Sequence, residues 1–112
     1  GHTETHPILA RLPADAARAE ILLGKESLAQ IVGAAPRTFA YPNGVPGKDY
    51  LVEHVAMVRE AGFEAAVTTA FGGVAADDDA LQLPRVIPWD QRAAAFARRA
   101  AQASRSPPGE RL

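Results

Sequence analysis

Two histidines near the start of the chain, His2 and His6, are the residues whose type and spacing point most directly to chemistry. Imidazoles four residues apart can bind one divalent cation, and neutral imidazole suits zinc, cobalt, nickel or iron. Pro7 favours a tight loop over a helix here, because the residue before a proline is kept out of the helical region. The HExxH protease motif is absent, since the acid stands third and not second. The alternative is a pair of exposed polar residues or the remnant of a purification tag.

Two helices are predicted to flank the segments that would position this pair. Apolar residues at helical spacing predict one helix from Asp15 to about Val32, with Gly33 as its C-cap. A second is predicted from about Lys48 to Ala61. The predicted buried faces comprise Ala17, Ile21, Leu28, Ile31 and Val32 in the first helix and Leu51, Val55 and Val58 in the second.

Three short β-prone segments, 38–41, 63–69 and 83–87, alternate with these helices, and Asp90 can cap a last helix reaching roughly Ala103. This alternation predicts an α/β fold with a mostly parallel sheet. Segment 63–69 is apolar enough to be covered on both faces. Three short strands leave open sheet edges, which proteins normally cover. We therefore expect residues 1–103 to be part of one domain whose other strands lie outside this chain, followed by a flexible tail over 104–112.

Composition excludes several classes of protein. No basic stripe with interleaved aromatic residues is present, which argues against nucleic acid as a partner. No apolar run approaches the roughly 20 residues of a membrane span. The absence of cysteine excludes thiolate ligands and disulfides.

Four segments in order resemble the polysaccharide deacetylase family, also called the NodB-homology domain or carbohydrate esterase family four. His2-Thr3-x-Thr5-His6-Pro7 resembles the family's second motif, and Phe39-Ala40-Tyr41-Pro42-Asn43-Gly44 looks like its third. The passage from Ala61 to Thr69 and the segment Leu83-Pro84-Arg85-Val86 resemble later landmarks. The resemblance covers roughly residues 1 to 90. It implies a distorted (β/α) barrel whose N-terminal strands lie outside this chain, so that residues 1–103 are its C-terminal part.

The resemblance also implies a mechanism and a set of site residues. His2 and His6 would be ligands of a divalent metal, most simply zinc, which polarises a water and an acetamide carbonyl. The backbone N–H of Asn43 would hold the oxyanion of the tetrahedral intermediate. The predicted substrate-binding residues are Tyr41, Pro42, Arg85 and Trp89. For Arg85 the alternative is an ion pair with an acid, and for Trp89 it is core packing.

Three departures from the family pattern bear on catalysis. The aspartate pair of the first motif, which supplies the general base and the third ligand, has no counterpart here. Ala40 stands where the third motif usually has an arginine, and the late histidine acid is missing. The remaining histidine, His54, falls in a predicted helix and is interpreted as a surface or half-buried residue. We therefore expect the isolated chain to be inactive.

The leading hypothesis is a metal-dependent hydrolase that removes acetyl groups from an N-acetylated polysaccharide or oligosaccharide. Its required partner would be the missing N-terminal segment of the same domain, and a periplasmic, cell-wall or secreted location is favoured. One alternative is a carbohydrate-binding or scaffold domain that kept the fold and lost catalysis. Another is a relative that hydrolyses non-sugar amides.

Overall fold

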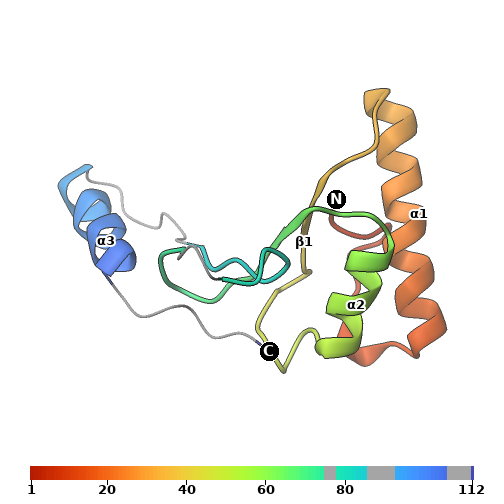
Figure 1. The fold of residues 1–112 in the computed structure, drawn as a ribbon, viewed down its shortest axis with the longest axis horizontal. Coiled ribbons are helices and arrows are strands. Elements are labelled where there is room, and N and C mark those ends of the chain that lie inside the picture. The colour runs from red at the N-terminus through yellow and green to blue at the C-terminus, as the bar shows by residue number, and fades with distance from the viewer. Residues whose placement is uncertain (75–77, 86–92, 106–111) are drawn as a thin grey trace.

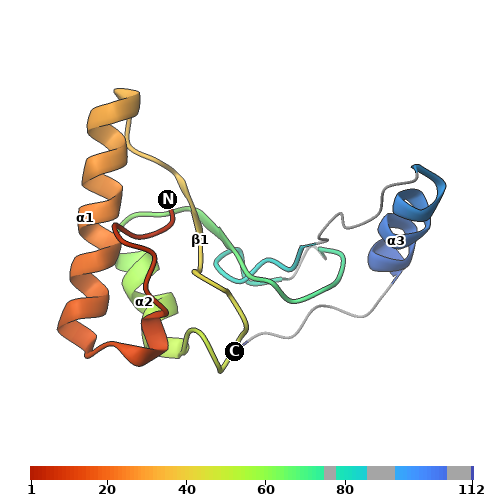
Figure 2. The ribbon, with the colours of Figure 1, turned by 180° about the vertical axis from the view of Figure 1, so that it is seen from behind.

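The computed structural model of the chain describes residues 1–74, 78–85, 93–105 and 112. The elements in chain order are η1 (Leu9–Arg11), α1 (Ala14–Val32), β1 (Thr38–Ala40), α2 (Val52–Glu60), β2 (Ala65–Val67) and α3 (Ala93–Arg105). Figures 1 and 2 show α1 and α2 packed beside each other next to β1, with α3 apart from them. Among the described residues, no helix has both the length and the hydropathy to cross a membrane.

Helix α1 follows the sequence prediction closely at both ends. It begins one residue earlier than expected, and Gly33 ends it in the left-handed conformation with φ of 83°. Ala17 and Ile21 are buried as predicted. The prediction was wrong for Ile31 and Val32, which are 82% and 66% exposed. The neighbouring helix α2 has 9 residues against 19 in α1, so the last turns of α1 extend beyond it.

Helix α2 begins at Val52, four residues later than predicted. The residues before it form a tight turn, in which the buried Asp49 carboxylate accepts a hydrogen bond from the Val45 N–H at 2.9 Å. Leu51 precedes the helix and is 38% exposed, so its assignment to the buried face was wrong. Val55 and Val58 are buried as predicted.

His54 is a core residue and not the surface or half-buried residue that the sequence indicated, since only 1% of it is exposed. Its Nδ1 accepts a hydrogen bond from the Leu51 N–H at 2.9 Å, which supports the first turn of α2. The proton of the neutral ring therefore lies on Nε2. Burial lowers the pKa of His54, and the nearby Glu53 carboxylate opposes this only in part.

Because His54 is buried in its neutral form, acid is expected to destabilise the fold through this residue. The unfolded chain takes up a proton near pH 6.5, whereas the folded chain does so only at lower pH. The stability linked to His54 is thus present above about pH 6.5 and is lost as the pH falls toward the folded-state pKa. Urea unfolding at pH 7.5 and 5.5 should show a larger loss for the wild type than for His54→Asn. Equal losses in the two proteins would contradict this.

The sheet is parallel, as the alternation of elements predicted. Strand β1 pairs with β2 in the register Thr38 to Ala65 and Ala40 to Val67. A parallel bridge from Val67 to Leu83 then brings a third segment alongside β2. In β2, Ala66 is buried whereas Ala65 and Val67 are half-buried, so the described residues cover the two faces of the sheet unequally. A hollow of about 390 Å³ borders both strands.

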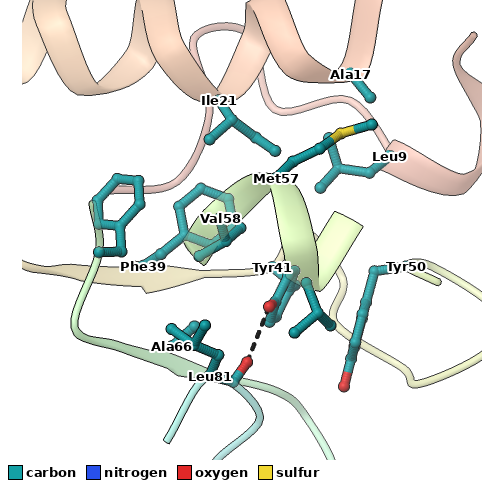
Figure 3. Packing of buried hydrophobic residues seen from close by; sticks show 12 residues of the cluster. Leu9, Ala17, Ile21, Phe39, Tyr41, Tyr50, Met57, Val58, Ala66 and Leu81 are labelled. Carbon is teal, nitrogen blue, oxygen red and sulfur yellow. Dashed lines mark hydrogen bonds between the residues drawn. The ribbon is translucent and has the colours of Figure 1, made fainter. Parts of the chain in front are cut away.

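The core lies between the covered face of the sheet and the helices α1 and α2, as Figure 3 shows. The rings of Tyr41 and Tyr50 stack with centroids 4.0 Å apart. The Tyr41 hydroxyl donates a hydrogen bond to the Leu81 carbonyl at 2.8 Å. This bond ties β1 to the segment beyond β2, and burial raises the Tyr41 pKa.

The C-terminal region agrees only in part with the predicted boundaries. Helix α3 extends to Arg105, so residues 104 and 105 are helical and do not belong to the predicted tail. Residues 86–92, which include the predicted helix cap, and 106–111 lie outside the described residues. Leu112 is held by the side-chain amide of Gln82. The Leu112 N–H donates to Gln82 Oε1 at 2.7 Å, and Gln82 Nε2 donates to the Leu112 carbonyl at 2.8 Å.

Candidate active site

The first six residues form a tight loop that brings His2 and His6 together. Their imidazole centroids are 4.5 Å apart, with the ring planes inclined by 59°. Thr3 and His6 both have positive φ, at 67° and 61°, which turns the backbone sharply between the two rings. The Thr3 hydroxyl accepts a hydrogen bond from the His6 N–H at 3.1 Å. The prediction of a tight loop is therefore confirmed, and the two candidate ligands lie side by side.

The orientation of the His2 ring is fixed by strand β1. Its Nδ1–H donates to the Ala40 carbonyl at 2.6 Å, which leaves Nε2 as the nitrogen with a free lone pair. The adjacent residue is tied to the same strand, because Gly1 donates to the Thr38 carbonyl at 2.6 Å and accepts from the Ala40 N–H at 2.8 Å. Metal-bound histidines usually donate their second nitrogen in this way, which fixes the tautomer and the ring orientation.

The surroundings of His2 favour a neutral imidazole. Burial lowers its pKa most strongly, and the hydrogen bond to Ala40 acts in the opposite direction. The charges of His6, Arg85 and the N-terminus lower the pKa further. A neutral imidazole is the form that binds a metal. The donor set therefore fits a divalent cation such as zinc, for which the pair would supply two of the four ligands of a tetrahedral site. Within the described residues, no group of three or more histidines, cysteines and carboxylates could complete it.

Arg85 lies close enough to His2 for its charge to lower the His2 pKa. Its backbone N–H donates to the Ala70 carbonyl at 2.9 Å, which fixes the start of this segment. The Nε atom of its side chain is buried and has no hydrogen-bond partner. The predicted alternative, an ion pair with an acid, is not formed within the described residues. The charge of Arg85 thus acts on His2 without an ion-pair partner among the described residues.

The turn at residues 41–44 places the predicted oxyanion donor at the surface. Asn43 is exposed, with φ of 59°, and no described residue accepts a hydrogen bond from its N–H. Gly44 follows with φ of 76°, and its carbonyl accepts from the Thr69 N–H at 2.9 Å, which anchors the turn to the end of β2. Tyr41 and Pro42, predicted to contact substrate, are both buried. Their side chains support the turn from the core, and the described residues leave neither side chain exposed at the surface.

Two residues of α1 that the sequence analysis did not assign to the site hold the histidine loop in place. The Glu20 carboxylate accepts hydrogen bonds from the N–H groups of Glu4 and Thr5, both at 3.0 Å, and from the Thr5 hydroxyl at 2.5 Å. Gly24 lies directly beneath the loop, where a Cβ atom would stand 2.4 Å from the carbonyl carbon of Thr3. A glycine inside a helical pattern was a usable signal for this close approach, whereas nothing in the sequence marked Glu20.

The other candidates from the sequence do not join the site. Trp89 lies outside the described residues, as does Asp77 of the acidic run. The Asp79 carboxylate accepts hydrogen bonds from the Leu81 N–H and the Gln82 side chain, both at 3.0 Å. It therefore stabilises a turn.

Comparisons with known proteins find a match over the region that contains the histidine loop and the turn after β1. A family model described as polysaccharide deacetylase matches residues 1–66, which is more than half of the chain. No curated protein sequence matches significantly. Among solved structures, the Streptococcus pyogenes deacetylase PplD in complex with acetate matches with a TM-score of 0.69 and 26% sequence identity. The match covers 76% of this chain and 36% of that one, so the chain corresponds to about a third of that deacetylase.

Proposed function

Because the chain belongs to the polysaccharide deacetylase family, we propose that it carries part of the active site of a metal-dependent hydrolase that removes acetyl groups from an N-acetylated polysaccharide. We further propose that the α/β unit is one part of a distorted (β/α) barrel, with the remaining strands supplied by an N-terminal segment. A periplasmic, cell-wall or secreted location would suit such a substrate.

The observation that carries the proposal is the orientation of His2 toward His6. With Nδ1 bonded to Ala40, His2 keeps Nε2 free to bind a metal, and its ring centroid lies 4.5 Å from that of His6. His2 and His6 would hold a divalent metal, with zinc the first choice for imidazole ligands. When bound, the metal supplies Lewis-acid activation of water and of the acetamide carbonyl.

The remaining residues have roles in binding and charge stabilisation. The N–H of Asn43 bonds to no described residue, and it is a main-chain donor suited to a developing oxyanion. Arg85, whose charge acts on His2, offers a positive charge suited to the polar groups of a sugar or to a carboxylate. The general base and the third ligand would come from carboxylates outside the described residues.

A second candidate function is carbohydrate binding without catalysis. It is favoured by Ala40, which stands where the family's third motif usually has an arginine. In this case the fold and the turn at residues 41–44 would be retained, and the polymer would be bound without being cleaved.

The test is acetate release from N-acetylglucosamine oligosaccharides by the natural polypeptide that contains residues 1–112. Zinc-dependent release, lost on chelation and restored by zinc, is the expected result. Asn43→Ala should retain most of the activity because the donor is a main-chain group. Residues 1–112 alone are expected to release no acetate. Binding of the oligosaccharide without release would favour the second candidate, and neither binding nor release would exclude both.

A further inference from the structure

The loop between the two histidines has a backbone conformation that needs support. Thr3 and His6 have φ of 67° and 61°, a region that residues with a Cβ seldom adopt and β-branched residues least of all. Such conformations persist only where the surrounding structure holds them. The contacts that hold the loop therefore determine whether the two imidazoles face each other.

Glu20 supplies most of these contacts from outside the loop. One carboxylate oxygen, Oε2, accepts from the N–H groups of Glu4 and Thr5 at 3.0 Å each. The other, Oε1, accepts from the Thr5 hydroxyl at 2.5 Å. Hydrogen bonds to a carboxylate are stronger than those to a neutral acceptor. Both oxygens thus bind the residues between His2 and His6.

We propose that Glu20 is a positioning residue for the metal site: it holds Thr5 and the adjacent backbone so that His2 and His6 face one divalent cation. This inference rests on the proposed function, because it takes the two histidines as ligands. Replacing Glu20 should therefore change the metal affinity, whereas replacing a residue that only packs α1 should not. Partners that orient metal ligands typically change affinity by 10–100-fold when they are removed.

The test is zinc affinity of the natural polypeptide that contains residues 1–112, measured by competition with a chromophoric chelator at pH 7.5. Glu20→Gln is expected to weaken binding by about 10-fold, and Glu20→Ala by about 10–100-fold. Thr5→Val should weaken it as well, whereas Thr5→Ser, which keeps the hydroxyl, should retain it. Glu26→Gln is the matched control, because Glu26 is exposed on the same helix and forms none of these hydrogen bonds. It should bind zinc like the wild type.

A measurement without metal separates positioning from loss of fold. In metal-free Glu20→Gln, NMR should show faster amide exchange at Glu4 and Thr5, with the core amides of α2 unchanged. Wild-type zinc affinity in Glu20→Gln, beside a loss in His2→Ala, would overturn the role of Glu20 and leave the histidine pair intact. Equal affinity in wild type and His2→Ala would overturn both the ligand pair and this inference. If Glu26→Gln weakened zinc binding as much as Glu20→Gln, the effect would come from the change in net charge. The positioning role of Glu20 would then be refuted.

Discussion

Replacing His2 or His6 with alanine is expected to weaken zinc binding by at least about 100-fold, since the loss of a ligand should exceed the 10–100-fold typical of an outer partner. Each imidazole would supply one of only two protein donors in the described part of the chain. Neither ring is a large component of the core, so the fold should persist in both variants. Zinc titration with a competing chelator, together with circular dichroism, measures affinity and folding separately.

His54→Asn provides the matched control for this experiment. His54 is buried and supports the start of α2, so its replacement should lower stability without changing zinc affinity. A loss of zinc binding in His54→Asn comparable to that in His2→Ala would indicate that affinity depends on folding in general. Unchanged affinity in both His2→Ala and His6→Ala would refute the ligand assignment.

The parts of the fold that the sequence predicted well are those fixed by local interactions. Helix α1 and its glycine cap follow from apolar spacing and from the freedom of Gly33 at positive φ. The loop at His2 to His6 also follows from local chemistry, because Pro7 and the threonines act within a few residues. The parallel order of the strands follows from their alternation with helices.

The predictions that were wrong concern contacts between distant segments. Ile31 and Val32 continue the apolar pattern of α1, yet they are exposed because the neighbouring helix is shorter. His54 looked like a surface residue because sequence spacing cannot show that its Nδ1 meets the Leu51 N–H in a buried position. The role of Tyr41 in substrate binding stays a prediction of the family motif, and the sequence did not show that its ring stacks on Tyr50 in the core.

The candidate site likewise combines features that local sequence predicts with contacts between distant segments that it does not. The histidine pair could be identified from the sequence, but the loop between the two histidines is held by Glu20 of α1. Glu20 lies 16 residues after Glu4 and 15 residues after Thr5. A single glutamate on a helix has many possible partners, so Glu20 could not be assigned. Gly24 could have been questioned, because glycine in a helix interior costs about 1 kcal/mol relative to alanine and needs a compensating reason.

The compensating reason for Gly24 is its close approach to the histidine loop, and we therefore expect Gly24→Ala to lower the stability of the fold. Helix propensity alone would make the variant more stable by about 1 kcal/mol. The added Cβ, however, would stand 2.4 Å from the carbonyl carbon of Thr3 and 2.8 Å from the nitrogen of Glu4. These are backbone atoms, so the loop or the helix must move. Overpacking of this kind costs about 1–3 kcal/mol, which equals or exceeds the gain in propensity.

Urea unfolding and zinc titration of Gly24→Ala test this directly, with Gln30→Ala as the control for propensity. Gln30 is exposed on the same helix, so its replacement by alanine should leave stability the same or slightly higher and zinc affinity unchanged. Gly24→Ala should instead lower the free energy of unfolding, weaken zinc binding, or do both, depending on whether the helix or the loop gives way. A variant as stable as Gln30→Ala, with wild-type zinc affinity, would show that the histidine loop does not lie against α1. The close approach at Gly24 therefore couples helix packing to the geometry of the candidate metal site.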